Sequence, residues 1–339
     1  MRDKRPPSLA PFSDEKQRVV LNLQQLYASW LEVERGLRKL PYGMKWKTIS
    51  GYDYLYDVAD RQGNGRSQGR RSAETEAQYA KYVDMRDRLR GQQAGLKDRL
   101  TEVCQQYRAL GLPMVPSEGA EILREADLRG LMPSHLIIVG TNALPAYAIE
   151  AGGLILDALQ ETQDFDMAWT GIAVSGLTPV KDMLQAVDPT YCVNEERRFQ
   201  MRNAKGYEVE LLCAPSRLPS RPRRDRPLPF GLPEQEWLLK GKFVQRVVVG
   251  RDATPARLAV PDPRWFGLQK LWLATKPERD ALKKPKDHRQ GMAVLNVVNE
   301  AMPHYDLGAA FAAELPDELR PHYDAWREQA PDAKARAIW

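Results

Sequence analysis

The sequence is poor in the side chains that usually bind zinc or form disulfides. It has three cysteines, Cys104, Cys192 and Cys213, and four scattered histidines among 339 residues. Because it contains neither a C-x-x-C pair nor an H-E-x-x-H run, a thiolate zinc site and a zinc hydrolase are not predicted. An odd number of widely separated cysteines also argues against a disulfide framework.

Long apolar runs are missing as well. Apolar stretches such as residues 135–139 and 153–156 are far shorter than the roughly 20 residues that a membrane-spanning helix needs. The charged first residues are not followed by the apolar segment that defines a secretory signal. We therefore expect a cytoplasmic protein with no membrane partner.

What the chain does contain is enough apolar surface for globular domains and a small excess of positive charge. Apolar residues make up 43% of the sequence, and 50 Lys and Arg against 45 Asp and Glu give a net charge of +5. This composition argues against wholesale disorder, and the length predicts two or three domains.

The first third of the chain is expected to be mainly helical. The predicted elements are a helix at 14–40, a hairpin at 44–59 around Gly51, a loop at 62–71 and a charged helix at 72–110. Ser72 is a suitable N-cap for the second helix because its hydroxyl can accept from a backbone N–H of the first turn. Gly91 and Gly95 are expected to bend or split that helix.

From residue 116 onward, strands and helices alternate, which predicts an α/β or α+β core. The predicted strands are 135–139, 165–170, 197–202, 207–213, 243–249 and 257–260, and the predicted helices are 141–159, 179–187, 264–275 and 286–302. We place the boundaries of three regions accordingly: an N-terminal helical region with a hairpin (1–115), a core (116–262) and a C-terminal helical region (263–339).

Two carboxylates placed two residues apart are the clearest chemical feature. Asp164 and Asp166 flank the start of a predicted strand, on which alternate residues share a face. Two carboxylates on one face repel each other unless a cation lies between them, and Mg²⁺ prefers oxygen ligands. The pair predicts a divalent metal site, with Glu210 of a later strand as the third ligand. Glu208 shares the face of Glu210 and is the alternative.

A turn before this acidic pair is suited to an anion. The predicted strand at 135–139 ends in Gly140-Thr141-Asn142 and continues directly into a helix. Backbone N–H groups, a hydroxyl and the positive end of a helix dipole can bind a triphosphate there. Together the two motifs predict metal-assisted phosphoryl or nucleotidyl transfer. The structural alternative is that the aspartates only cap a turn and that the glycine turn only starts a helix.

In this order, the motifs resemble those of the DNA polymerase beta-type nucleotidyltransferase superfamily: an apolar strand, a glycine turn, a helix, D-x-D and a later carboxylate. More narrowly, the run GTNALPAYAIEAG at 140–152 is similar to that of a bacterial family with the nucleotidyltransferase fold. Two positions depart from the superfamily pattern. Thr141 stands where Ser or Gly is usual, and Glu210 stands where Asp is more common.

The resemblance implies an α+β fold with a nucleotidyltransferase-type mixed sheet and flanking helices, between a helical N-terminal region with a hairpin and a helical C-terminal region. It also implies two Mg²⁺ ions, with Mn²⁺ as an alternative, and a catalytic and metal-binding set of Asp164, Asp166 and Glu210. The residues implied in NTP binding are Gly140, Thr141, Asn142 and Lys270. For Lys270, on a predicted amphipathic helix, the alternative is a solvated surface lysine.

A basic segment is the predicted nucleic-acid contact. Residues 214–229 contain five prolines and several arginines, which predicts an exposed loop rather than regular structure. Arginines neutralise phosphates without recognising the base sequence. The arginines proposed for this contact are Arg217, Arg221, Arg223 and Arg224.

The sequence thus predicts an enzyme that transfers a nucleoside monophosphate from an NTP to a hydroxyl of a tRNA or RNA end or of a protein side chain. Family analogy adds a toxin or defence role, with a cognate antitoxin or a homodimer as a further partner. The alternatives are a catalytically inactive member that binds nucleic acid or a protein, and an enzyme that modifies a small molecule.

Overall fold

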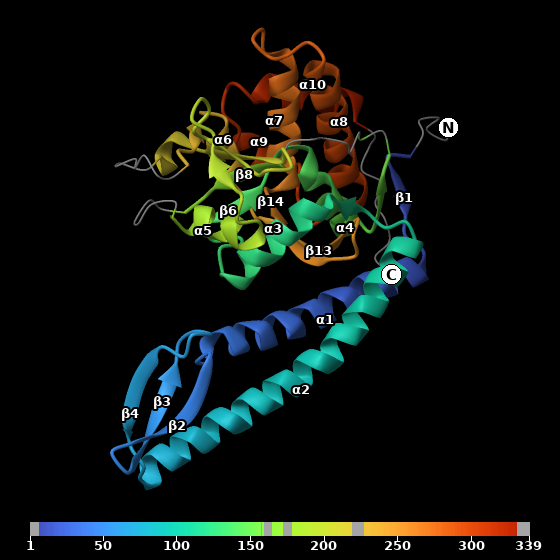
Figure 1. Ribbon diagram of the computed structural model, residues 1–339. Coiled ribbons are helices and arrows are strands. Elements are labelled where there is room, and N and C mark those ends of the chain that lie inside the picture. Colours follow the sequence, from blue (N-terminus) through green and yellow to red (C-terminus); the bar gives the residue numbers. More distant parts are fainter. Residues whose placement is uncertain (1–6, 157, 159–164, 172–177, 219–226, 331–339) are drawn as a thin grey trace. The chain divides into compact units, whose positions relative to one another are not determined.

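The computed structural model describes residues 7–156, 158, 165–171, 178–218 and 227–330 (Figure 1). Its contacts divide the chain into two compact units, Asn22–Val103 in one and Met1–Leu21 with Cys104–Trp339 in the other. Helices alternate with strands of mixed sheets, so the predicted α+β class is confirmed.

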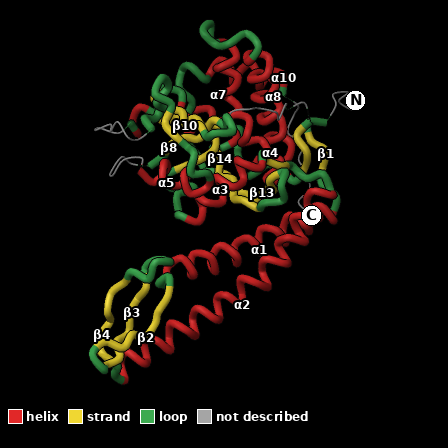
Figure 2. Tube along the Cα trace, in the orientation of Figure 1, coloured by secondary structure: helices red, strands yellow, loops and turns green. Residues whose placement is uncertain are grey.

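The unit Asn22–Val103 combines long helices with a small antiparallel sheet. Its elements are most of α1 (Asp14–Lys39) and α2 (Ala73–Ala109), with β2 (Gly43–Ile49), β3 (Tyr52–Val58) and β4 (Gly65–Arg70). The strands lie side by side in the order β2-β3-β4 (Figure 2). The predicted helices and the predicted hairpin around Gly51 are therefore present.

The start of α2 has the predicted cap. The Ser72 hydroxyl accepts from the backbone N–H of Thr75 at 3.3 Å, and the Thr75 hydroxyl accepts from the N–H of Ser72 at 2.9 Å. Of the bend or split that is expected at Gly91 and Gly95, the split is wrong, because α2 is one continuous helix, and the bend stays a prediction. A glycine in the interior of a helix lowers the stability of that helix by only about 1 kcal/mol, and α2 is otherwise rich in good helix formers.

The loop expected at 62–71 is also partly wrong, because residues 65–70 form β4. A Cβ atom on Gly65 would lie 1.9 Å from the carbonyl oxygen of Asp57. Glycine at this position lets the two backbones approach and pair. The glycine and polar residues that suggested a loop are thus compatible with an edge strand.

The other unit contains a six-stranded mixed sheet. Its strands are β6 (Leu136–Ile138), β8 (Phe165–Trp169), β11 (Glu208–Cys213), β10 (Gln200–Arg202) and β9 (Cys192–Val193), in this order, with β12 (Phe230–Gly231) paired to β11. Strands β8 and β11 are parallel, whereas β6 and β10 run antiparallel to their partners. All three residues of β6 are fully buried, so this strand anchors the sheet in the core.

Two smaller sheets and three helices complete the core. The strands are β1 (Leu9–Pro11) with β7 (Gly153–Ile155), and β5 (Met114–Val115) with β13 (Val244–Gly250) and β14 (Pro255–Val260). The helices are α3 (Ser117–Leu128), α4 (Leu144–Ala151) and α5 (Thr178–Val187). Helix α3 packs against β13, β14 and α5.

The helix expected at 141–159 is shorter than predicted. A 3-10 turn, η1 (Gly140–Ala143), precedes α4, and α4 ends at Gly152, which has a φ of +68°. Glycine adopts this left-handed conformation without strain and so terminates the helix. Gly153 then begins β7, where a Cβ atom would lie 2.6 Å from the carbonyl oxygen of Ala10 in β1.

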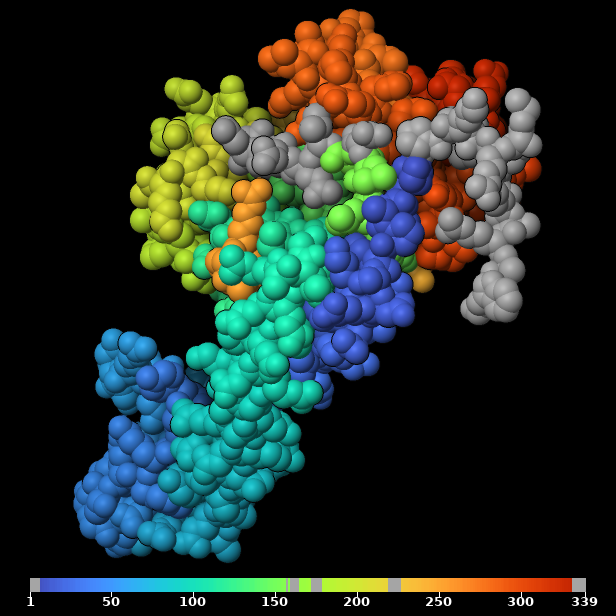
Figure 3. Space-filling model, turned by 90° about the vertical axis from the view of Figure 1, so that its right-hand side faces the viewer, coloured from blue at the N-terminus to red at the C-terminus, as the bar shows by residue number. Residues whose placement is uncertain are grey.

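The C-terminal part is helical, as expected. Its helices are α7 (Pro263–Thr275), α8 (Lys283–Ala301), α9 (Ala309–Ala313) and α10 (Arg320–Gln329), and their orange to red atoms form one block in the space-filling view (Figure 3). Helices α7 and α8 pack so closely that a Cβ atom on Gly291 would lie 2.7 Å from the Gly267 carbonyl oxygen. Among the described residues, no helix has both the length and the apolar character of a membrane span.

Candidate active site

Two neighbouring strands bring two carboxylates together. In the parallel pair β8 and β11, Asp166 is the register partner of Glu210. Burial alternates along β11, so that Val209, Leu211 and Cys213 face the core whereas Glu210 faces away from it. The sheet therefore presents Asp166 and Glu210 side by side on one face.

Glu210 is held in place by a chain of amides. The Nε2 atom of Gln200 donates to Oε1 of Glu210 at 2.6 Å, and Nδ2 of Asn194 donates to Oε1 of Gln200 at 3.1 Å. Gln200 is buried, and its strand β10 pairs with β11 so that residue 200 lies opposite residue 210. One oxygen of Glu210 is thereby fixed, which orients the carboxylate.

The glycine turn lies directly against this carboxylate pair. Gly140 has a φ of +68°, and a Cβ atom there would lie 2.3 Å from Oδ2 of Asp166. The next residue, Thr141, is buried, and its hydroxyl accepts from Nε2 of Gln290 on α8 at 3.2 Å. The turn is therefore fixed between the sheet and the C-terminal helices.

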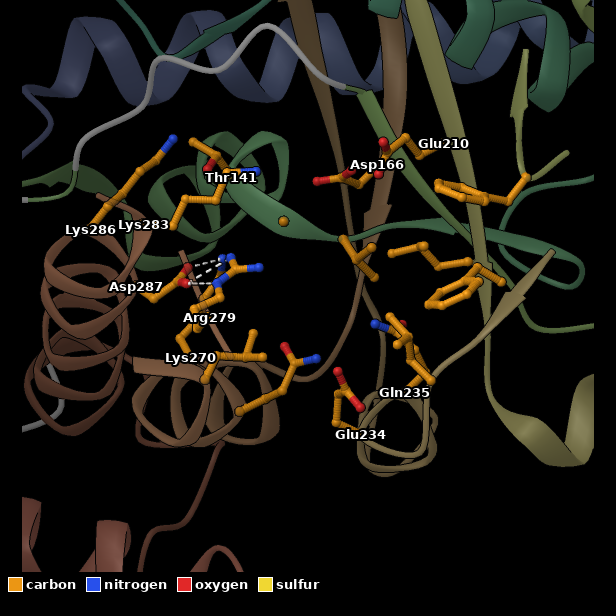
Figure 4. Close-up of a pocket in the computed structure, with 18 residues that line it drawn as sticks. Thr141, Asp166, Glu210, Glu234, Gln235, Lys270, Arg279, Lys283, Lys286 and Asp287 are labelled. Carbon is orange, nitrogen blue, oxygen red and sulfur yellow. Dashed lines mark hydrogen bonds and ion pairs between the residues drawn. The ribbon is translucent and has the colours of Figure 1, made fainter. Parts of the chain in front are cut away.

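A cavity of about 330 Å³ opens at this place. Gly140, Thr141, Asp166 and Glu210 line it together with residues of β12, α6 (Gln235–Leu238), α7 and α8. Figure 4 shows Lys283, Lys286 and Thr141 at one side of the cavity and Glu210 and Gln235 at the other. The cavity is thus chemically different at its two ends.

One end carries four cationic side chains: Lys270, Arg279, Lys283 and Lys286. Asp287 is buried between two of them, with Oδ1 at 2.7 Å from Nζ of Lys270 and Oδ2 at 2.7 Å from Nη2 of Arg279. The pKa of Lys286 is lowered by burial first and then by the charge of Lys270. This excess of positive charge favours a polyanion such as a triphosphate.

The other end is apolar and aromatic. Phe199 and Phe230 have ring centroids 5.3 Å apart, and the leucines that line the cavity are Leu212, Leu232 and Leu273. Gln235 and Glu234 lie on this side (Figure 4), where Gln235 is buried and Glu234 is half-buried; the buried Gln269 also lines the cavity.

The structure brings five of the residues singled out from the sequence around one cavity: Gly140, Thr141, Asp166, Glu210 and Lys270. Asn142 is buried and is not among the described residues that line it. Of the two glutamates considered, Glu210 lines the cavity, whereas Glu208 lies 3.7 Å from Arg202 in an ion pair.

The remaining candidates divide into two groups. Asp164, Arg221, Arg223 and Arg224 lie outside the described residues. Arg217 is described in a 3-10 turn, η2 (Pro215–Arg217), where it is half-buried and does not line the cavity. Among the described residues, no group of three or more Asp, Glu, His or Cys side chains is placed to hold a metal ion.

Sequence reasoning missed several residues of the cavity, including Arg279, Glu234, Gln235 and the two phenylalanines. The run Lys283–Lys286 was visible as a basic cluster, and its position at the start of α8 was the available signal. No such signal marked Asp287, whose partners lie on α7 and on the segment between the helices.

Comparison with known proteins agrees with this geometry. A family model described as Nucleotidyltransferase matches residues 117–316, which is more than half of the chain. The chain belongs to this nucleotidyltransferase family. The matched range contains every described residue that lines the cavity of this nucleotidyltransferase. Searches of curated proteins and of solved structures gave no match.

Proposed function

We propose that this nucleotidyltransferase transfers a nucleoside monophosphate from an NTP to a hydroxyl of RNA in a Mg²⁺-dependent reaction. The observation that carries the proposal is the pairing of Asp166 with Glu210 beside a cavity whose far end holds four cationic side chains. Charge of both signs is thus arranged along one cavity, as an NTP with its metal ion requires.

The donor set fits a hard cation. Asp166 and Glu210 supply carboxylate oxygens on adjacent strands, and repulsion between them is relieved by a divalent ion. Bound Mg²⁺ would supply neutralisation of the charge that develops on the phosphate oxygens. Asp164 stays a prediction as a further ligand, because it lies outside the described residues.

The residues of the chain then have distinct roles. The backbone of Gly140 and the cations Lys283 and Lys286 would bind the phosphates of the NTP. Glu210, oriented by Gln200, would accept the proton of the attacking hydroxyl. The oxygen of the attacking hydroxyl forms a bond to the α-phosphorus of the NTP. The bond between the α-phosphorus and the oxygen that bridges to the β-phosphate breaks, and pyrophosphate leaves.

An exposed face of the sheet β2-β3-β4 favours RNA as the acceptor. Alternation along the strands places these side chains on one face: Lys45, Lys47, Tyr52, Tyr54, Tyr56 and Arg70. The guanidinium of Arg70 lies 3.5 Å from the ring centroid of Tyr52, which is 47% exposed. Asp53 and Asp57 of β3 alternate to the opposite face. A face that carries cations and aromatic rings but, among these strands, no carboxylates is suited to bind a single-stranded nucleic acid.

Purified protein incubated with Mg²⁺, each α-labelled NTP in turn and total tRNA tests the proposal. We expect label in the RNA with the wild type, no label with Asp166→Asn, and normal labelling with the control Asp182→Asn, which replaces an exposed aspartate on α5. If the label is found in protein instead, RNA is not the acceptor. If the wild type labels neither RNA nor protein, the proposal is wrong. The toxin role, the antitoxin, the homodimer and the cytoplasmic location stay predictions.

A further inference from the structure

The cavity has an aromatic end that phosphate binding does not explain. Phe230 is 50% exposed although it is a large apolar side chain, and it lies against Phe199 in the cavity wall. Both phenylalanines are fixed by β11: Phe230 sits in β12 opposite Leu212, and the carbonyl of Phe199 accepts from the N–H of Leu211 at 2.8 Å. A rigid, partly exposed aromatic surface is therefore built into the sheet.

Gln235 contributes a second, independent observation. Its side chain lines the same cavity and is 5% exposed, and its Oε1 atom has no hydrogen-bond partner among the described residues. A buried amide oxygen without a partner costs free energy, so such groups are usually paired. A ligand that enters the cavity and draws the amide into a hydrogen bond would remove this cost.

The order of the groups along the cavity identifies the ligand part that belongs here. Along β11, Glu210 and Leu212 share one face and lie about 7 Å apart, which is two residues of a strand. Phe230 pairs with Leu212 and therefore lies on the side of Glu210, whereas Lys283 and Lys286 lie at the opposite side of the cavity (Figure 4). An NTP has the same linear order, with the base at one end, the α-phosphate between, and the β- and γ-phosphates at the other end.

We infer that the Phe199 and Phe230 end is the nucleobase subsite, in which the base stacks on Phe230 and its edge hydrogen-bonds to the amide of Gln235. This inference rests on the proposed function, because it assigns part of the same NTP. Stacking on an aromatic side chain tolerates every base. Selection among the bases then depends on hydrogen bonds to the edge of the base. Gln235 provides one of these hydrogen bonds, Glu234 can add an acceptor, and Gln269 can add a second amide.

Binding of the four Mg·NTPs and of Mg·tripolyphosphate, measured by calorimetry, tests the subsite. Tripolyphosphate has the phosphates but no base. For Phe230→Ala we expect binding of all four NTPs to weaken about tenfold or more, with tripolyphosphate binding unchanged. The control Leu21→Ala, which shortens another exposed apolar side chain, on α1, should change neither.

The variant Gln235→Leu gives a signature that a merely structural residue would not give. Because the amide oxygen has no hydrogen-bond partner in the part of the chain that the structure describes, its removal should leave the Tm unchanged or raise it. The same variant should weaken NTP binding and alter the order of preference among the four bases. A lowered Tm together with unchanged base preference would overturn the role of Gln235.

The outcomes separate the two proposals. If the wild type binds neither NTPs nor tripolyphosphate, the proposed function fails. The nucleobase subsite alone is wrong if the wild type binds both ligands but Phe230→Ala leaves NTP binding intact. It is also wrong if Phe230→Ala weakens tripolyphosphate binding as much as NTP binding. If Phe230→Ala raises the KM for RNA while NTP binding is intact, the aromatic end binds the acceptor instead.

Discussion

The carboxylate of Asp166 occupies the space in which a side chain on residue 140 would have to lie. A Cβ atom on Gly140 would be 2.3 Å from Oδ2 of Asp166, and the N–H of Val139 donates to the Asp166 carbonyl at 3.1 Å. The glycine turn and the acidic strand are therefore one assembly, in which the turn that we propose for phosphate binding and the carboxylate that we propose for metal binding are positioned by each other.

Gly140→Ala should abolish nucleotidyl transfer because the new methyl group displaces Asp166. The left-handed φ of residue 140 also costs a non-glycine residue about 1–2 kcal/mol. Gly130→Ala is the matched control, since Gly130 has a φ of +72° and open space around a Cβ atom. We expect urea denaturation to show a similar loss of stability for both variants. Label transfer should be lost only for Gly140→Ala. Equal activity of the two would show that the contact with Asp166 is unimportant.

Glu210→Gln should reduce transfer by about 10²-fold or more, as expected for loss of a group that accepts a proton. Its neighbour two residues earlier, Glu208, is the matched control, because it lies on the same strand but is paired with Arg202. Glu208→Gln should retain nearly full activity. Single-turnover label transfer measures both. The reverse result, with Glu208→Gln inactive, would move the role of the third carboxylate to Glu208.

Much of this assembly could be predicted from the sequence because its signals are local. The alternation of Glu208, Val209 and Glu210 predicts a half-buried strand, and the apolar run before Gly140 predicts a buried one. The order of the motifs was sufficient to predict that Gly140, Asp166 and Glu210 lie at one site.

The missed features depend on contacts between distant segments. Strand β4 exists because Gly65 fits against the Asp57 carbonyl of β3, which no local pattern encodes. Phe230 lines the cavity because β12 pairs with β11, about twenty residues earlier in the chain. Asp287 contacts Lys270 only because α7 packs on α8.

The three thiols should differ sharply in reactivity. Cys104 and Cys213 are fully buried, and burial raises their pKa to about 12 and about 11, whereas Cys192 is exposed. Because the thiolate is the reactive species, we expect a thiol reagent at pH 8 to modify only Cys192 in the native protein. Mass spectrometry of the modified protein checks this, with Cys192→Ser as the control. Rapid modification of Cys104 or Cys213 without denaturant would contradict the described core.

Asp287→Asn should destabilise the protein strongly, because Asp287 is the counter-charge of buried Lys270 and also pairs with Arg279. Removal of one partner of a buried ion pair typically costs about 3–5 kcal/mol, whereas replacement of both partners by apolar residues is often neutral. The double variant Lys270→Met, Asp287→Leu should therefore be more stable in urea denaturation than Asp287→Asn. Asp87→Asn, which breaks an exposed pair with Arg86, should leave the denaturation midpoint unchanged.

The same variants separate a structural role of Lys270 from a role in NTP binding. If Lys270 contacts the phosphates, the double variant should bind Mg·tripolyphosphate more weakly than the wild type at equal stability. If Lys270 only neutralises Asp287, the double variant should bind tripolyphosphate normally, and the cationic end would then depend on Lys283 and Lys286. A single variant Asp287→Asn as stable as the wild type would contradict the buried ion pair itself.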